Sequence, residues 1–213
     1  MIVTQVTELS KSRSKVYIDQ EFAFVLYKGE LSLYHVAEGR EIAKKDYEEI
    51  IYTVLPKRAR LRAMNLLQKR SYTEKQLTDK LKEGWYPPVI IEEAIAYVKS
   101  FHYIDDLQYA ADYISCYEGR KSLKKIEQDL LQRGISREVL QEALRSWEEN
   151  GGSQDEMSMI LELLEKKHYS CNCDIKEKRR IYASLLRKGY SAEQVQEAMR
   201  LKTAEFVYSV DIV

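Results

Sequence analysis

The segment Leu130-Leu131-Gln132-Arg133-Gly134 decides the fold, because it recurs with small changes at two other places in the chain. Its counterparts are Lys80-Leu81-Lys82-Glu83-Gly84 and Leu185-Leu186-Arg187-Lys188-Gly189. A glycine that follows a leucine-containing helical segment is typical of the left-handed residue that ends a helix. We therefore expect all three glycines to end helices. Their spacing of about 50 to 55 residues lies in the range of helical repeats.

Helix-start signals lie between these helix ends. Three stretches predict capping boxes, in which a serine and a later Glu or Gln bind the free amides of a helix start: Ser71-Tyr72-Thr73-Glu74, Ser153-Gln154-Asp155-Glu156 and Ser191-Ala192-Glu193-Gln194. Pro87-Pro88 and Asp105-Asp106 are predicted first-turn residues, for fixed geometry and for favourable charge. Apolar residues then recur at helical spacing, so each predicted helix has one core face.

The first 36 or so residues follow a different pattern. Residues 16–18 and 22–26 are β-branched and aromatic runs separated by Asp19-Gln20-Glu21, which predicts a small antiparallel sheet. Residues 2–9 are expected to add a strand. Residues 31–36 fit either a strand or a short helix, because apolar runs this short are ambiguous.

The predicted fold class is mainly α, with tandem three-helix repeat modules and a small N-terminal β-sheet. A three-helix unit buries little surface alone, so we expect neighbouring modules to pack into an elongated, curved array. The expected domains are an N-terminal hairpin plus helix at 1–55, modules at 56–101, 105–149 and 153–203, and a tail at 204–213.

Composition and chain start predict a folded, soluble, cytoplasmic protein. Hydrophobic residues make up 45% and charged residues 32% of the 213 residues, which suits a packed core. No apolar stretch approaches the roughly 20 residues of a membrane span, and the N-terminus lacks a signal-peptide pattern. The three cysteines, Cys116, Cys171 and Cys173, are an odd number, which agrees with a reducing compartment. We expect a monomer.

Few residues resemble a catalytic or metal site. Asp105 and Asp106 are the most enzyme-like pair, but adjacent helical residues do not face each other, and acids at a helix start are stabilised by its dipole. His168 with Cys171 and Cys173 resembles half a metal site, whereas a closed zinc site needs four ligands. Phosphate-loop, dinucleotide, nucleophile-elbow and zincin motifs are absent from the sequence. We expect no catalytic residue, no metal and no cofactor.

Charge is balanced in sum but segregated along the chain. Lys plus Arg and Asp plus Glu each number 34. Basic residues gather on predicted helices of all three modules: Lys57, Arg58, Arg60, Arg62, Lys69 and Arg70; Arg120, Lys121, Lys124, Lys125 and Arg133; and Lys176, Lys178, Arg179, Arg180 and Arg187. Their recurrence predicts exposed basic faces that bind a phosphate backbone or an acidic protein groove. Stacked repeats would align the first two faces as one surface.

Several of these residues carry a family resemblance. Arg70-Ser71 followed by Glu74, Leu77, Lys80 and Leu81 resembles the first-module signature of the RecX family, and residues 104–110 (IDDLQYA) resemble the second. Residues 119–122 (GRKS), Ile126, Leu130 and residues 133–135 (RGI) extend the match. The resemblance extends more weakly through the N-terminal sheet and the third module, which matches poorly at Ser170 to Asp174. The signature positions, expected to be structural, are Ser71, Glu74, Leu77, Leu81, Asp105, Asp106, Tyr109, Ala110 and Gly134.

The resemblance implies a protein that binds the RecA recombinase filament on DNA, lodges in its groove and inhibits its recombinase, ATPase and coprotease activities. It also implies weak contact with single- or double-stranded DNA. The expected contact residues are Arg58, Arg62, Lys69, Arg70, Arg120, Lys121, Lys124, Lys125 and Arg133. A stand-alone DNA-binding helical module is the alternative, because three-helix units with basic helices resemble helix-turn-helix domains. A metal-dependent enzyme that uses Asp105 and Asp106 is a third hypothesis.

Overall fold

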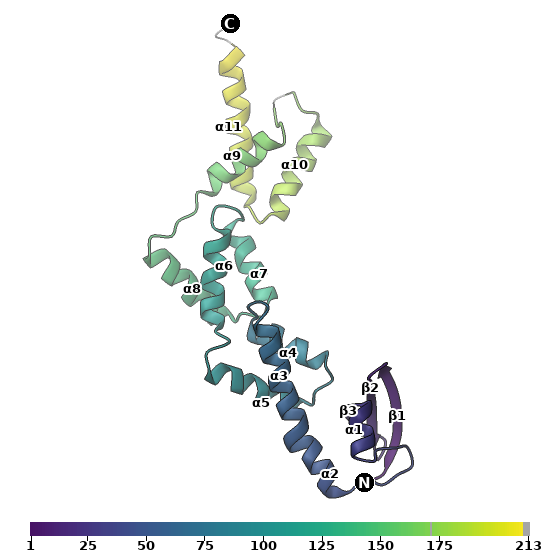
Figure 1. Ribbon diagram of the computed structural model, residues 1–213. Helices are drawn as coiled ribbons and strands as arrows, with labels where there is room; N and C mark the ends of the chain where they lie inside the picture. The colour runs from purple at the N-terminus through teal and green to yellow at the C-terminus, as the bar shows by residue number, and fades with distance from the viewer. Residues whose placement is uncertain (171, 211–213) are drawn as a thin grey trace. The chain divides into compact units, whose positions relative to one another are not determined.

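The chain folds into two compact units, the first spanning Met1–Asp105 and the second beginning at Asp106. The computed structural model describes residues 1–170 and 172–210, with side chains through residue 204 in the second range. Figure 1 labels the strands and helices along the chain. Each unit contains its own clusters of buried hydrophobic residues, so each is described separately below.

The first unit starts with a three-stranded antiparallel sheet in the order β1-β2-β3. The strands are β1 (Val3–Ser10), β2 (Arg13–Ile18) and β3 (Glu21–Tyr27). The expected sheet is therefore confirmed, including the strand predicted for residues 2–9. In β2 the buried residues are Ser14, Val16 and Ile18, every second position, because side chains alternate between the two faces of a strand.

Helices follow the sheet, and residues of both belong to one buried cluster. The ambiguous residues 31–36 lie partly in a short helix, α1 (Lys28–Leu33), so the helical alternative holds there. The chain then runs through α2 (Lys44–Glu49), a π-helix (Ile50–Val54) and α3 (Leu55–Leu67) without a break. The predicted boundary at residue 55 thus lies inside a continuous helical segment.

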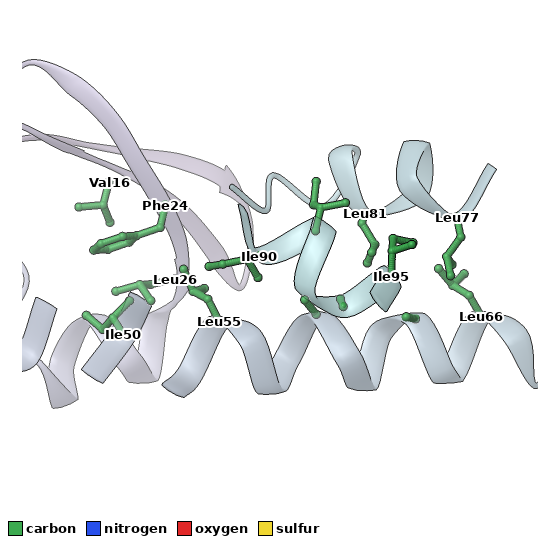
Figure 2. Packing of buried hydrophobic residues seen from close by; sticks show 14 of the residues in the cluster. Val16, Phe24, Leu26, Ile50, Leu55, Leu66, Leu77, Leu81, Ile90 and Ile95 are labelled. Atoms are coloured by element: carbon green, nitrogen blue, oxygen red, sulfur yellow. The ribbon is translucent and has the colours of Figure 1, made fainter. Parts of the chain in front are cut away.

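Pro56 explains the π-helix. Proline has no backbone N–H, and its ring crowds the carbonyl four residues back, which is that of Tyr52. The wider turn relieves this crowding, and the Leu55 amide binds the Ile50 carbonyl instead. Figure 2 shows Phe24 and Leu26 of the sheet near Ile50 and Leu55 of this helical segment.

The first three-helix module consists of α3, α4 (Glu74–Lys82) and α5 (Pro88–Ser100). Leu77 and Leu81 of α4 are fully buried, and Ile95 of α5 lies beside them (Figure 2). The same buried cluster includes Phe24, so the sheet and the first module share one core.

The second unit contains two further three-helix modules. The elements are α6 (Asp106–Tyr117), α7 (Leu123–Gln132) and α8 (Arg137–Glu149), then α9 (Glu156–Lys166), α10 (Ile175–Arg187) and α11 (Ala192–Val210). Ile114, Ile126 and Leu130 belong to one buried cluster, and Ile160 and Leu185 belong to another. Each of these two modules therefore has its own small core.

Hydrogen bonds join these two modules at the start of α7. The buried Ser122 hydroxyl accepts from the Lys125 amide, capping α7, and donates to the Lys188 carbonyl over 2.7 Å. Gly189 has φ +96°, and a Cβ there would lie 2.4 Å from the Ser122 oxygen. Gly189 is therefore required both by its backbone conformation and by the close approach of α7.

Side chains from the start of α9 complete the junction. The Gln154 amide donates to the Lys121 carbonyl over 2.6 Å, and the Leu123 amide donates to a Glu156 carboxylate oxygen over 2.8 Å. The loop at residues 121–123 thus binds the module that follows through three polar contacts.

The helix ends agree with the prediction at Gly134 and Gly189, which have φ of 92° and 96°. The prediction is wrong at Gly84. Trp85 is the left-handed residue there, with φ 64°. The Trp85 amide binds the Lys82 carbonyl over 2.9 Å, and the chain turns one residue later than expected.

The predicted caps are correct at one of three starts. Ser191 exchanges hydrogen bonds with Gln194, as expected for a capping box. The predicted box at Ser71 is wrong, because Thr73 caps α4 and pairs with Gln76. The box at Ser153 is also wrong, because Asp155 caps α9. In both cases a capping residue nearer the helix accepts the free amide.

Candidate interaction surface of the helical modules

The basic residues of α3 divide into exposed and paired groups. Arg62 is exposed on α3, and Lys69 and Arg70 are exposed just beyond its end. The Arg70 guanidinium lies 4.3 Å from the centre of the Tyr72 ring. These positions agree with the predicted exposed basic face.

Arg58 does not belong to that exposed face. Its side chain is 18% exposed, forms an ion pair with Glu30 and donates to the Val25 carbonyl over 3.1 Å. Arg60 likewise pairs with Glu93, a residue of α5. The prediction of exposure is wrong for Arg58, because this turn of α3 faces the sheet and α1. Arg58 therefore connects α3 to the N-terminal region.

Residues at the start of α7 show the same division. Arg120 and Lys124 are exposed. Lys121 and Lys125 instead converge on Asp129, with nitrogen–oxygen distances of 2.7 and 2.8 Å. Both lysines are partly buried by this contact, so much of their charge is neutralised within the module.

Asp129 is the centre of this cluster. The Tyr113 hydroxyl donates to its carboxylate over 3.0 Å, and Lys121 donates to the Tyr113 oxygen over 2.8 Å. Burial alone raises the pKa of Asp129, but hydrogen bonds from Lys121, Lys125 and Tyr113 lower that pKa to about 2. Burial lowers the pKa of Lys121, whereas the bonds to Asp129 and Tyr113 outweigh it and raise that pKa.

Arg133 is held by the aromatic face of α6. Tyr109, Tyr113 and Tyr117 recur every fourth residue, so they share one face of that helix. The Arg133 guanidinium donates to the Tyr109 hydroxyl over 2.8 Å and lies 4.8 Å from the centre of the Tyr113 ring. Lys121 lies 3.8 Å from the Tyr117 ring centre. Arg133 and Lys121 thus form cation–π contacts with aromatic rings of their own module.

The basic residues of α10 are more open. Lys176, Arg179 and Arg187 are exposed. Arg180 forms an exposed ion pair with Glu177 over 3.3 Å, which contributes little in water. The third module therefore carries basic residues on α10, as the sequence predicted.

The signature residues lie mostly at structural positions. Leu77, Leu81 and Ala110 are fully buried. Glu74 binds Lys99 over 2.7 Å and so connects α4 with α5. Ser71 is exposed and is not the cap of α4.

Asp105 and Asp106 mark the start of α6, which begins at Asp106. Asp105 directly precedes the helix and is exposed. Both residues take part in interactions within the chain, so neither is free. Their position agrees with the prediction that acids at this start interact with the helix dipole.

The structure gathers no metal site in its described part. Among residues 1–170 and 172–210, no three His, Cys, Asp or Glu side chains are grouped as metal ligands would be. Cys173 instead contacts the Ser170 amide and the His168 carbonyl, whereas Cys171 lies outside the described residues. In that same part of the chain, no helix is both long and apolar enough to cross a bilayer.

Sequence reasoning missed several residues with clear structural roles. Thr73 caps α4, Ser122 joins two modules by a hydrogen bond, and Asp129 binds the lysine cluster. Lys125 and Asp129 at i and i+4 gave a signal for their ion pair. No local pattern pointed to Ser122, because its partner, Lys188, is 66 residues away.

Family models match all three modules. Residues 59–97 match "RecX, first three-helix domain", residues 105–144 match the second and residues 154–199 match the third. The third module, where the sequence resemblance is weaker, is thus also matched by a model of the family. Each matched stretch lies within the module range predicted from the sequence.

Relatives and solved structures that carry the name RecX are also similar to this chain over most of its length. "Regulatory protein RecX" of Caldanaerobacter subterraneus subsp. tengcongensis is 30% identical over 205 residues, covering 94% of this chain and 100% of the relative. The protein of the same name from Clostridium acetobutylicum is 26% identical and covers 89% of this chain and 90% of its own. A crystal structure of regulatory protein RecX has a TM-score of 0.57 at 22% identity and covers 92% of this chain and 98% of its own. The structure of RecX from Lactobacillus salivarius has a TM-score of 0.53 at 22% identity and covers 75% of this chain and 99% of its own.

Proposed function

The chain belongs to the RecX family of regulatory proteins, and on that premise we propose that it binds the RecA recombinase filament on DNA and inhibits the filament's recombinase, ATPase and coprotease activities. RecX proteins are regulators and not enzymes. The protein therefore acts by occupying a surface of its partner, and the charges that it leaves exposed matter most.

The observation that carries the proposal is the set of exposed cations in both units. Arg62, Lys69 and Arg70 in the first unit and Arg120 and Lys124 in the second are exposed. Within the part of the chain that the structure describes, no ion pair involves any of these five. Cations that no internal carboxylate neutralises are available to an acidic protein groove or to phosphates, and they speed association.

The remaining expected contact residues have a supporting role in this proposal. Arg58, Lys121, Lys125 and Arg133 already bind groups of their own unit. If these side chains bound a partner, they would first have to break those contacts. They would therefore contribute less to the free energy of binding. We propose that Arg62, Lys69, Arg70, Arg120 and Lys124 bind the filament directly.

The test measures recombinase ATPase on single-stranded DNA with this protein added at substoichiometric ratios. The wild-type chain is expected to reduce turnover. The double variant Arg120→Glu/Lys124→Glu should inhibit weakly, and the remaining inhibition should depend less on salt because fewer screened contacts remain. Exposed substitutions should shift stability by only about 0.5 kcal/mol, so circular dichroism should be unchanged.

A matched control separates these contacts from net charge. Arg137 and Arg145 are also exposed, on α8, but they lie outside the expected contact set, and Arg137→Glu/Arg145→Glu changes the net charge by the same amount. This control should inhibit like wild type. Full inhibition by the folded Arg120→Glu/Lys124→Glu variant would exclude the α7 contacts, and an inactive wild-type chain would exclude the function itself. Binding to bare DNA as tight as to recombinase-coated DNA, at physiological salt, would favour a stand-alone DNA-binding module.

A further inference from the structure

The outer face of the N-terminal sheet combines cations and aromatic rings. In β2 the side chains of Arg13, Lys15 and Tyr17 alternate with the buried positions, so they point away from the core. Phe22 is the β3 partner of Tyr17 in the antiparallel register. Trp85, from the loop between α4 and α5, joins this face.

Three aromatic rings form a connected row there. The Phe22 ring lies 5.8 Å from the Tyr17 ring and 5.9 Å from the Trp85 ring, edge to face in both cases. The Lys15 ammonium lies 3.3 Å from the centre of the Trp85 ring. Phe22 is 39% and Trp85 41% exposed. A large part of this aromatic surface therefore faces solvent.

Trp85 occupies its place at a cost in backbone energy. Its φ of 64° lies in the left-handed region, which a bulky residue rarely adopts. This conformation lies just past the end of α4, where a left-handed residue turns the chain out of the helix. The turn places the 41% exposed indole against Lys15 on the sheet face.

Two cationic side chains of β2, Arg13 and Lys15, lie on the same face as this row. Neither Arg13 nor Lys15 has an ion pair within the described residues. Burial raises the pKa of the Tyr86 hydroxyl, and the nearby charges of Arg58, Arg62 and Arg13 act against that rise. Arg13 of the sheet face and the exposed Arg62 of α3 thus both act on the same tyrosine.

We propose that this sheet face, formed by Arg13, Lys15, Tyr17, Phe22 and Trp85, binds single-stranded nucleic acid. Unpaired bases stack on Trp85 and Phe22, and the adjoining phosphates bind Lys15 and Arg13. An unpaired strand offers both flat rings and regularly spaced anions, which this combination of aromatic and cationic side chains fits. A duplex hides the faces of its bases, and an acidic peptide lacks stacking rings at each charge. The family resemblance implies only weak contact with DNA and assigns it to no surface; the sheet face gives that contact a site, and this binding needs no recombinase.

Intrinsic fluorescence tests the stacking directly. The chain has two tryptophans, so Trp147→Phe leaves Trp85 as the single reporter. Titration with oligothymidylate should quench and shift the Trp85 emission. A fluorescently labelled oligothymidylate should then lose roughly tenfold or more in affinity for Trp85→Gly, since stacking on an aromatic ring contributes that much per base. Glycine adopts a φ of 64° without strain, so this variant should fold.

Two further variants separate stacking from charge. Lys15→Gln should lower the slope of log affinity against log salt by about one, because one phosphate contact is lost. Tyr52→Ala is the matched control, because Tyr52 is a 74% exposed aromatic residue elsewhere in the same unit, and its removal should leave binding unchanged.

The outcomes are distinct. Absent quenching of Trp85, or equal affinity of wild type and folded Trp85→Gly, would overturn the proposal. Equal quenching by a duplex or by polyglutamate would overturn it too, because stacking on unpaired bases would not explain the binding. No recombinase is present in these measurements, so a negative result here does not bear on inhibition of the filament.

Discussion

Replacing Asp129 with asparagine should destabilise the second unit in a way that depends on pH. Asn keeps the size of the side chain but removes the charge that Lys121 and Lys125 bind at 2.7 and 2.8 Å. The two lysines are then left close together without a carboxylate. A partly buried cation without a partner is costly, so the ion-pair cluster and not the shape of residue 129 determines the loss.

The magnitude follows from the pKa of the Asp129 carboxyl. Its fall from an ordinary value of 3.8 to about 2 corresponds to about 2 kcal/mol of folding free energy. The folded-state pKa is the lower one, so the unfolded chain takes up the proton first. The stabilisation is therefore complete above about pH 4, declines as the pH falls and is lost below about pH 2. The carboxylate is only 14% exposed, so solvent screens it weakly.

The assay is urea unfolding monitored by Trp147, which packs against the core of α6–α8. Trp85→Phe removes the other tryptophan, so the signal reports this module alone. At pH 7 Asp129→Asn should lower the unfolding free energy by about 2 kcal/mol relative to the Trp85→Phe parent. Between pH 4 and pH 2 this difference should shrink toward zero, because the parent then loses the same charge.

The control is Asp112→Asn, which removes an exposed α6 carboxylate that accepts a hydrogen bond from Gln108. Its effect should stay within about 0.5 kcal/mol at every pH. The reasoning fails if Asp129→Asn has no effect at pH 7. It also fails if the difference from the parent is the same at pH 7 and pH 2, because then packing and not charge would explain the loss.

Other predictions concern single elements and are read from thermal or urea unfolding. Gly189→Ala should destabilise the protein by about 1 to 3 kcal/mol, since the φ of Gly189 is +96° and the added Cβ would meet the Ser122 oxygen. Adding Ser122→Ala should recover part of this loss, because the clashing oxygen is then removed. Additive losses in the double variant would contradict the contact. Thr73→Ala should cost about 1 kcal/mol and Ser71→Ala under about 0.5, because Thr73 caps α4; equal costs would contradict that assignment. Asp106→Ala should cost roughly 0.5 to 2 kcal/mol through a lost helix-start interaction, and an unchanged midpoint with lost inhibition would make it a contact residue.

Periodicity alone predicted most of the fold. Spacing of apolar residues and the repeated glycines located the three modules, because a helix needs one buried face and a permissive residue where it ends. Runs of β-branched and aromatic residues, separated by turn residues, located the strands. The prediction failed at Gly84, where the left-handed residue is Trp85. A bulky residue of this type rarely adopts a positive φ.

Caps were harder to predict, because several candidates stand next to one another. Residues 71–74 contain both Ser71 and Thr73, and only the exact start of α4 decides between them. The junction at Ser122 had no local signal, since its partner carbonyl at Lys188 and the close approach of Gly189 come from a different module. Contacts between distant segments depend on tertiary packing, which a single sequence does not show.

The candidate site shows why a count of basic residues does not define a surface. Arg120, Lys121 and Lys124 look equivalent in the sequence, but Lys121 is bound to Asp129 at 2.7 Å, whereas the other two are exposed. Reversing all three charges at once would therefore break the ion pair between Lys121 and Asp129. It would also place a second carboxylate beside that of the partly buried Asp129. Destabilisation of α7 would lower inhibition even if no residue there touched the partner. Changing only Arg120 and Lys124 removes the exposed charge and leaves Asp129 paired, so lost inhibition in a protein of unchanged stability would point to the binding surface itself.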